Sequence, residues 1–309
     1  MRCIICGKEK ENSLFSAEHI LPDAIGGCLT IENVCKDCND YLGRKVDCGL
    51  TEDFLVKLAR YTHKIPNKQR EIISPFLHLR EEATNRRVDF IIDKKTGEPK
   101  KPYVYPSPTQ FDEKTGTLNF SLDEKDRNKA KDIVRKYAKR NNLPTPTEKD
   151  LQAMLNDATV CSERPLLSEK IEFNPYAVGK GMLKIVYEMA YYWLRDCYLS
   201  DPVAEEFRRY LLNEDVSEPQ IKGSLCVGLD VYKKLPQNLC KDSSHAAFLM
   251  RDGNILFVVA RVFDCYEMRA CISENAAKYE LEDDDMPCII LDAASHVKQE
   301  GRRNDFWFV

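Results

Sequence analysis

Long hydrophobic runs are missing from this sequence of 309 residues. No apolar stretch approaches the roughly 18 residues that a membrane-spanning helix needs, and the first twenty residues lack the apolar core of a signal peptide. A surplus of positive charge is missing too, because 46 Lys and Arg stand against 50 Asp and Glu. These absences argue against a membrane protein and against a histone-like protein that binds nucleic acid through bulk positive charge. We expect a folded, cytoplasmic chain with no membrane partner.

Cysteine, by contrast, is abundant. Thirteen cysteines in a chain without an export signal indicate a reducing compartment, where an extracellular type of disulfide framework is not expected. The cysteines are then metal ligands, core residues or reactive thiols. Only four of them have paired spacing, and most of the other nine are expected to be small apolar core residues.

The charges and the hydrophobic patterns divide the chain unevenly. Residues 61–150 carry 20 basic and 14 acidic residues, whereas residues 151–309 carry 18 and 26. Hydrophobic periodicity and capping residues predict helices over 52–63 (capped by Thr51), 126–140, 147–156, 176–196 and 202–212. Alternating patterns predict a β-meander within 88–122 and strands over 224–232, 245–252, 255–263 and 265–272. The helix over 176–196 is apolar nearly all round, which predicts a buried central helix.

The paired cysteines form two CxxC motifs, Cys3/Cys6 and Cys35/Cys38, which lie 32 residues apart. Each motif can present two thiolates from one tight turn, and two motifs complete a tetrahedral four-cysteine zinc site without an open position. Such a site is structural, and a module with few long apolar runs needs the folding free energy that metal binding supplies.

Between the two motifs lie Glu18-His19 and Gly26-Gly27, and Asn39 directly follows the last cysteine. In this order of features the sequence resembles the HNH endonucleases of the ββα-metal superfamily, and most closely their four-cysteine zinc variety, as in phage recombination endonuclease VII. The resemblance covers about residues 1–50. It implies an α+β chain with a small zinc-stapled ββα-metal nuclease module over residues 1–60, followed by a larger mixed α+β domain over 61–309 for substrate selection, dimerisation or regulation.

The resemblance also implies roles for individual residues. His19 would be the general base that takes a proton from the attacking water, and Glu18 and Asn39 would hold one catalytic Mg²⁺ or Mn²⁺ ion. Glu18 stands where the family commonly has Asp. Because strand alternation sends adjacent side chains to opposite faces, Glu18 and His19 need a distorted strand end to act together. Asn33 is the candidate for orienting the base, although it lies only two residues before Cys35. Asp47 either adds a second carboxylate or caps local structure.

The basic helix over 126–140 has two interpretations. Its cations either form a solvated helix face or contact phosphates of a nucleic acid, and in the second case the contacts would come from Lys129, Arg135, Lys136, Lys139 and Arg140.

Three functions remain open from the sequence. The first is a metal-dependent endonuclease that cuts nucleic acid, with double-stranded DNA as the expected substrate. The second is a catalytically idle zinc module that binds nucleic acid or protein. The third is an effector of an anti-phage defence or toxin system, which a second copy, a regulatory protein or a ligand controls through residues 61–309.

Overall fold

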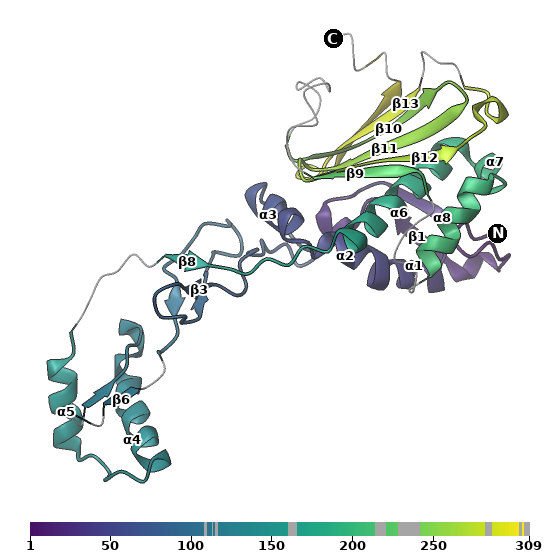
Figure 1. Cartoon of the computed structure of the whole chain (residues 1–309). Helices are drawn as coiled ribbons and strands as arrows, with labels where there is room; N and C mark the ends of the chain where they lie inside the picture. Colours follow the sequence, from purple (N-terminus) through teal and green to yellow (C-terminus); the bar gives the residue numbers. More distant parts are fainter. Residues whose placement is uncertain are drawn as a thin grey trace. The chain divides into compact units, whose positions relative to one another are not determined.

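The computed structural model describes residues 1–107, 110–112, 114, 117–159, 166–213, 221–227, 242–281, 286–302 and 305. The chain folds as two compact units, and Figure 1 shows their elements. The first unit combines Met1–Ile73 with Glu172–Val309, and the second is the inserted segment Ser74–Ile171. The boundary expected at residue 60 does not coincide with this division. The two differ because residues from the N-terminal segment and from the C-terminal part of the chain pack into one hydrophobic core.

The N-terminal segment forms a β-hairpin followed by a helix. Strand β1 (Phe15–His19) pairs antiparallel with β2 (Thr30–Cys35), and α1 (Lys36–Leu42) follows at once. The remaining elements of this segment are η1 (Asn12–Leu14), η2 (Asp23–Ile25), η3 (Gly43–Asp47), α2 (Cys48–Thr51) and α3 (Phe54–Thr62). The order strand, strand, helix is the ββα arrangement that the resemblance implies.

The turn between β1 and β2 requires glycine. Gly26 has a left-handed φ of +86°, and a Cβ there would lie 2.6 Å from Ala293. A Cβ on Gly27 would lie 1.9 Å from the carbonyl oxygen of Leu21. Only glycine permits both the backbone conformation and the close approach. The turn therefore packs closely against Ala293 in the C-terminal part of the chain.

Helix α6 (Pro175–Leu194) lies at the centre of the first unit, as its all-round apolar pattern predicts. It contacts α2 and η3 of the N-terminal segment and also β11 and β12 of a six-stranded sheet. Figure 1 shows the helices on one side of this sheet. Two shorter helices, α7 (Asp196–Leu199) and α8 (Pro202–Leu212), pack beside α6.

The sheet is antiparallel, in the order β14-β13-β10-β11-β12-β9. Its strands are β9 (Gly223–Val227), β10 (Ser244–Asp252), β11 (Ile255–Val262), β12 (Tyr266–Ser273), β13 (Pro287–Asp292) and β14 (Val297–Arg302), with the turn η6 (Ala276–Lys278) after β12. Asp252 pairs with Ile255 across the predicted Gly253-Asn254 turn. Only the first part of the strand expected over 224–232 lies within the described residues, and Cys161 and Cys240 lie outside them.

The second unit consists of short strand pairs and two longer helices. Its strands are β3 (Arg80–Glu81), β4 (Val88–Asp89), β5 (Tyr103–Val104), β6 (Gln110–Asp112), β7 (Thr117–Asn119) and β8 (Leu167–Ser168). Its helical segments are η4 (Glu124–Lys129), α4 (Ala130–Arg140) and α5 (Glu148–Asp157). In the described part of this unit the strands form separate pairs rather than the expected β-meander.

The sequence predicts the capping residues of α5 and α8 correctly, but the capping residue predicted for α3 is wrong. Thr147 and Asp150 form the predicted capping box of α5, and Asp201 caps α8. The start of α3 differs, because the Asp53 carboxylate, not Thr51, accepts hydrogen bonds from Leu55 and Val56. Thr51 instead ends α2, so the chain makes one more short helix than the periodicity indicates.

Candidate HNH site

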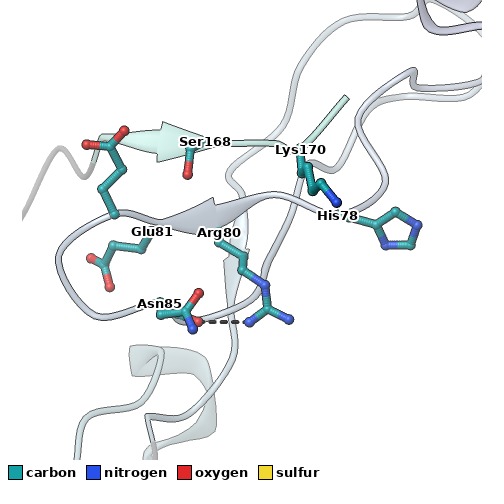
Figure 2. A pocket seen from close by; sticks show the side chains of 7 residues that line it. His78, Arg80, Glu81, Asn85, Ser168 and Lys170 are labelled. Atoms are coloured by element: carbon teal, nitrogen blue, oxygen red, sulfur yellow. Dashed lines mark hydrogen bonds between the residues drawn. The ribbon is translucent and has the colours of Figure 1, made fainter. Parts of the chain in front are cut away.

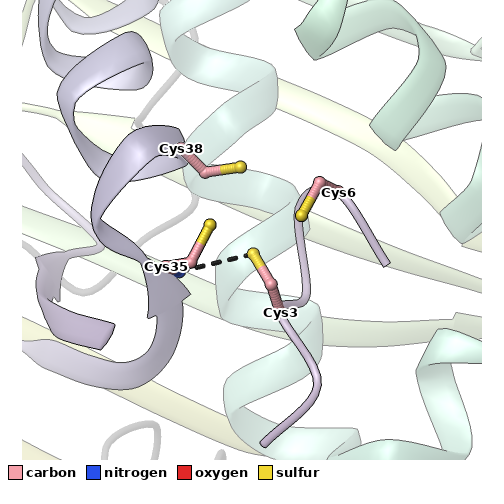
Figure 3. A group of neighbouring side chains, drawn as sticks. All are labelled: Cys3, Cys6, Cys35 and Cys38. Atoms are coloured by element: carbon pink, nitrogen blue, oxygen red, sulfur yellow. Dashed lines mark hydrogen bonds between the residues drawn. The ribbon is translucent and has the colours of Figure 1, made fainter. Parts of the chain in front are cut away.

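The four paired cysteines come together in one cluster. Their sulfur atoms all lie within 4.8 Å of one another. Figure 3 shows the four side chains gathered at one place. Cys3 and Cys6 lie on a tight turn in which the Gly7 amide donates to the Cys3 carbonyl. Cys35 ends β2, and Cys38 lies in the first turn of α1. The cluster that the CxxC spacing predicts is therefore present.

The donor set of this cluster fits a structural zinc ion. Four thiolates at about 2.3 Å from a tetrahedral ion have sulfur separations compatible with the observed cluster. The Cys35 amide donates to Sγ of Cys3 (3.4 Å), and Nζ of Lys10 lies 3.2 Å from Sγ of Cys35. A hydrogen bond from Cys38 lowers the pKa of Cys3 to about 4, and the same pairing with Cys3 raises the pKa of Cys38.

The hairpin between the cysteine pairs is bulged just before Glu18. Ser16 pairs with Val34 and Glu18 pairs with Ile31, so β2 has one more residue than β1 over this stretch. The additional length falls at Glu32-Asn33. Adjacent side chains nevertheless differ in environment: Glu18 is buried, with 3% exposure, whereas His19 is half-buried.

Asn39 connects α1 to β1. Its Nδ2 donates to the Ala17 carbonyl (2.8 Å) and to Oγ of Ser16 (3.1 Å). These bonds use the amide nitrogen and leave the amide oxygen as the atom that a cation could bind. Asn33 accepts a bond from the Ile4 amide through its carbonyl, which ties β2 to the first cysteine turn. Among the described residues no hydrogen bond joins Asn33 to His19.

Glu18 forms an ion pair with a residue from a distant part of the chain. Its Oε1 lies 2.5 Å from Nζ of Lys184 on α6. The same ammonium lies 3.0 Å from Oε2 of Glu188 and 3.5 Å from Oδ1 of Asp47. Asp47, for which the sequence leaves two roles open, therefore belongs to a buried acidic cluster around one lysine.

The electrostatics of this cluster are set by burial. Burial raises the pKa of Glu18, of Asp47 and, most strongly, of Glu188. Burial alone lowers the pKa of Lys184, but the three surrounding carboxyl groups outweigh it and raise that pKa above its ordinary value. Lys184 is therefore an ammonium at neutral pH.

Sequence reasoning missed Lys184 and Glu188. The available signal was a Lys and a Glu spaced four residues apart inside an otherwise apolar helix, because two charges at such positions are buried only when they have partners. Their partners in the N-terminal segment lie more than 130 residues away in sequence and cannot be identified from local patterns.

The residues around Glu18 offer oxygen atoms to a divalent cation. Three carboxyl groups face a single ammonium, and neither oxygen of Glu188 receives a well-directed hydrogen bond from the described residues. The carboxylate of Glu18 has a second oxygen besides the one that contacts Lys184, and oxygen donors are what Mg²⁺ prefers. The oxygen donors of these carboxyl groups therefore fit such an ion, which Glu18 would share with Lys184.

The five cations of the expected nucleic-acid surface fall into two groups. Lys129 pairs with Asp126 (2.7 Å), and Arg135 pairs with Glu148 (2.6 Å). Lys136, Lys139 and Arg140 are exposed, and no ion pair involves them in the described part of the chain. Among the described residues, Lys136, Lys139 and Arg140 are therefore the three of these five cations whose charge no carboxylate neutralises.

The second unit also has a cavity of about 390 Å³ between β3 and β8. Figure 2 shows its lining, in which the Arg80 guanidinium donates to the Asn85 carbonyl (3.0 Å). Its buried carboxylate, Glu81, is neutralised by Arg86 (2.6 Å). The lining mixes both signs of charge and contains no paired catalytic groups.

Comparison with known proteins identifies one segment. A family model described as HNH endonuclease matches residues 3–55. No curated protein and no solved structure matches the chain. The matched segment contains the cysteine cluster, Glu18, His19, Asn33 and Asn39, and together these findings fit an HNH zinc module with a nucleic acid as its substrate. In the described residues, every helix is too short or too polar to span a bilayer.

Proposed function

We propose that this protein is a metal-dependent HNH endonuclease that hydrolyses phosphodiester bonds in DNA. The observation that carries the proposal is the match of residues 3–55 to the HNH endonuclease family, in a segment whose four cysteines cluster around the expected ββα arrangement. The similarity to the endonuclease VII variety is part of the same proposal.

His19 is the general base in this proposal. It takes a proton from the water that attacks the scissile phosphorus, for which its neutral imidazole must be available near neutral pH. Asn33 lies in the adjacent bulge and is proposed to orient this base. Cys38 would be a ligand of the structural zinc ion, and Asn39 follows it directly, so a bound zinc ion would help to set the position of Asn39.

Glu18 and Asn39 would hold the catalytic Mg²⁺ or Mn²⁺ through a carboxylate oxygen and an amide oxygen. When bound, such an ion supplies positive charge that stabilises the developing phosphorane and the leaving oxygen. The chain's own contribution is to hold Asn39 by its bonds to Ser16 and Ala17, so that the amide oxygen needs no reorganisation.

Binding of double-stranded DNA is assigned to the inserted unit. Residues 74–171 carry 19 basic and 16 acidic residues, whereas the rest of the chain carries 27 and 34. The exposed Lys136, Lys139 and Arg140 are proposed to contact phosphates, with Lys129 and Arg135 able to join by exchanging their carboxylate partners.

Residues beyond the matched segment are proposed to control the nuclease. They make up most of the chain, which suits an effector of anti-phage defence in the cytoplasm, regulated by a second copy, a protein or a ligand. Activity that is complete in the monomer at every protein concentration would contradict this part of the proposal.

Cleavage of supercoiled plasmid, linear duplex and RNA tests the substrate assignment. We expect Mg²⁺ or Mn²⁺ to support cutting of both DNA forms and EDTA to abolish it. Binding without cutting in the presence of either ion would instead support the second candidate, an idle zinc module, which the engagement of Glu18 by Lys184 favours.

A further inference from the structure

Lys184 is a fully buried cation that reaches the end of β1 from outside the matched segment. Its Nζ donates to the His19 carbonyl (2.6 Å) and lies 2.5 Å from Oε1 of Glu18. A second carbonyl, that of Ile20, lies 3.4 Å away. The ammonium therefore contacts the side chain of one proposed site residue and the backbone of the other.

Packing alone does not account for a lysine at this position. The neighbours Leu183 and Ile185 are buried and apolar, and an apolar residue at 184 would avoid the cost of removing a charge from water. The contacts that offset this cost are made by Nζ of Lys184 with two backbone carbonyls at the end of β1 and with three carboxyl groups. Each contact holds its partner group in one orientation.

We propose that Lys184 is a positioning residue of the nuclease site. By holding the carbonyl of His19 and the carboxylate of Glu18, it sets the geometry of the strand end from which the imidazole projects, and it competes with a divalent cation for Glu18. This inference depends on the proposed endonuclease activity and adds α6 to the machinery that supports it.

The test uses full-length protein with Lys184→Met and with the double variant Lys184→Met/Glu188→Met. The double variant replaces a buried charged pair, one helical turn apart, by apolar residues of similar length, an exchange that buried sites often tolerate. Lys180→Met is the matched control, because Lys180 lies one turn earlier on α6 and donates to the Asn213 carbonyl instead (2.7 Å). The readouts are zinc content, thermal unfolding, plasmid cleavage per folded molecule and Mn²⁺ binding by electron paramagnetic resonance.

We expect the folded, zinc-loaded Lys184 variants to cleave about 100-fold more slowly, the loss that a displacement of about 1 Å can cause. Their Mn²⁺ dissociation constant should fall by about tenfold, because the competing ammonium is gone. Lys180→Met should match wild type in both measurements.

Two results would overturn the role of Lys184. One is cleavage at the wild-type rate by a folded Lys184 variant. The other is a loss that only follows the folded fraction, with unchanged Mn²⁺ binding, as a purely structural residue would give. Failure of the proposed function looks different, because then the wild-type protein itself cleaves nothing.

Discussion

At the scale of single residues, the site depends on side chains that are tied to the backbone of another element. Asn39 bonds to two atoms of β1, and Lys184 bonds to the backbone of His19. Such ties fix the orientation of a reacting group before substrate arrives, which is where preorganised sites gain their rate.

Asn39→Ala removes both bonds to β1 and the proposed ion ligand. We expect cleavage to fall by about 100-fold or more, since orientation and ion binding are both lost. Ser16→Ala is the control, because it deletes only the bond at 3.1 Å and keeps the bond to the Ala17 carbonyl. Initial rates of plasmid cleavage at saturating Mg²⁺ distinguish the two variants, and equal rates would contradict the role of Asn39.

At the scale of elements, the C-terminal sheet contacts the turn between β1 and β2. His245 on β10 is completely buried, and its Nε2 lies 2.9 Å from the Ile25 carbonyl. Its Nδ1 accepts a bond from the Phe263 amide, so Nε2 is the donor of the neutral ring. Burial lowers the pKa of His245 to about 4.

This pKa predicts an acid-sensitive contribution to stability. Between pH 6.5 and 4 the unfolded chain binds a proton at His245 that the folded chain does not, so stability falls as the pH falls. The loss approaches about 3 kcal/mol below pH 4, from a shift of roughly 2.5 pKa units. We expect His245→Gln to flatten this part of the stability profile in denaturant titrations, relative to wild type at each pH. Parallel profiles would contradict the prediction.

The elements also show how far sequence patterns reach. The two CxxC motifs, the caps of α5 and α8 and the apolar helix α6 depend on local spacing, and each was predicted from the sequence. The ion pair of Glu18 with Lys184 joins residues 166 positions apart, and no local sequence pattern predicts such a contact. The cap of α3 was misplaced because Thr51 and Asp53 are both good capping residues, and only tertiary contacts such as the bond from Tyr266 to Asp53 favour one.

At the scale of the whole molecule, the segment that matches the HNH family model is part of a larger unit. Ile4 accepts a bond from the Tyr187 hydroxyl on α6, and the core contains residues from both ends of the chain. Shared burial of this kind makes folding of the matched segment depend on the C-terminal part. The inserted unit, by contrast, has its own elements and a positive balance of charge.

This division predicts where DNA affinity resides. Lys136→Glu/Lys139→Glu/Arg140→Glu should weaken DNA binding for every sequence and flatten its salt dependence, since each lost phosphate contact reduces the slope by about 1. Lys94→Glu/Lys95→Glu/Lys101→Glu is the matched control, with the same change of charge on exposed residues elsewhere in the unit. Fluorescence anisotropy over a range of salt concentrations measures both, and equal effects would assign the affinity to net charge rather than to α4.

The most direct test of the nuclease assignment is the Mg²⁺-dependent cleavage rate of supercoiled plasmid by His19→Ala beside wild type, with zinc content measured on the same samples. The half-buried His19 lies at the end of β1, outside the cysteine cluster, so its loss should leave the metal site and the fold intact. We predict full zinc occupancy and loss of cleavage by at least about 100-fold, as expected for removal of a general base. Cleavage at the wild-type rate by zinc-loaded His19→Ala would contradict the assignment.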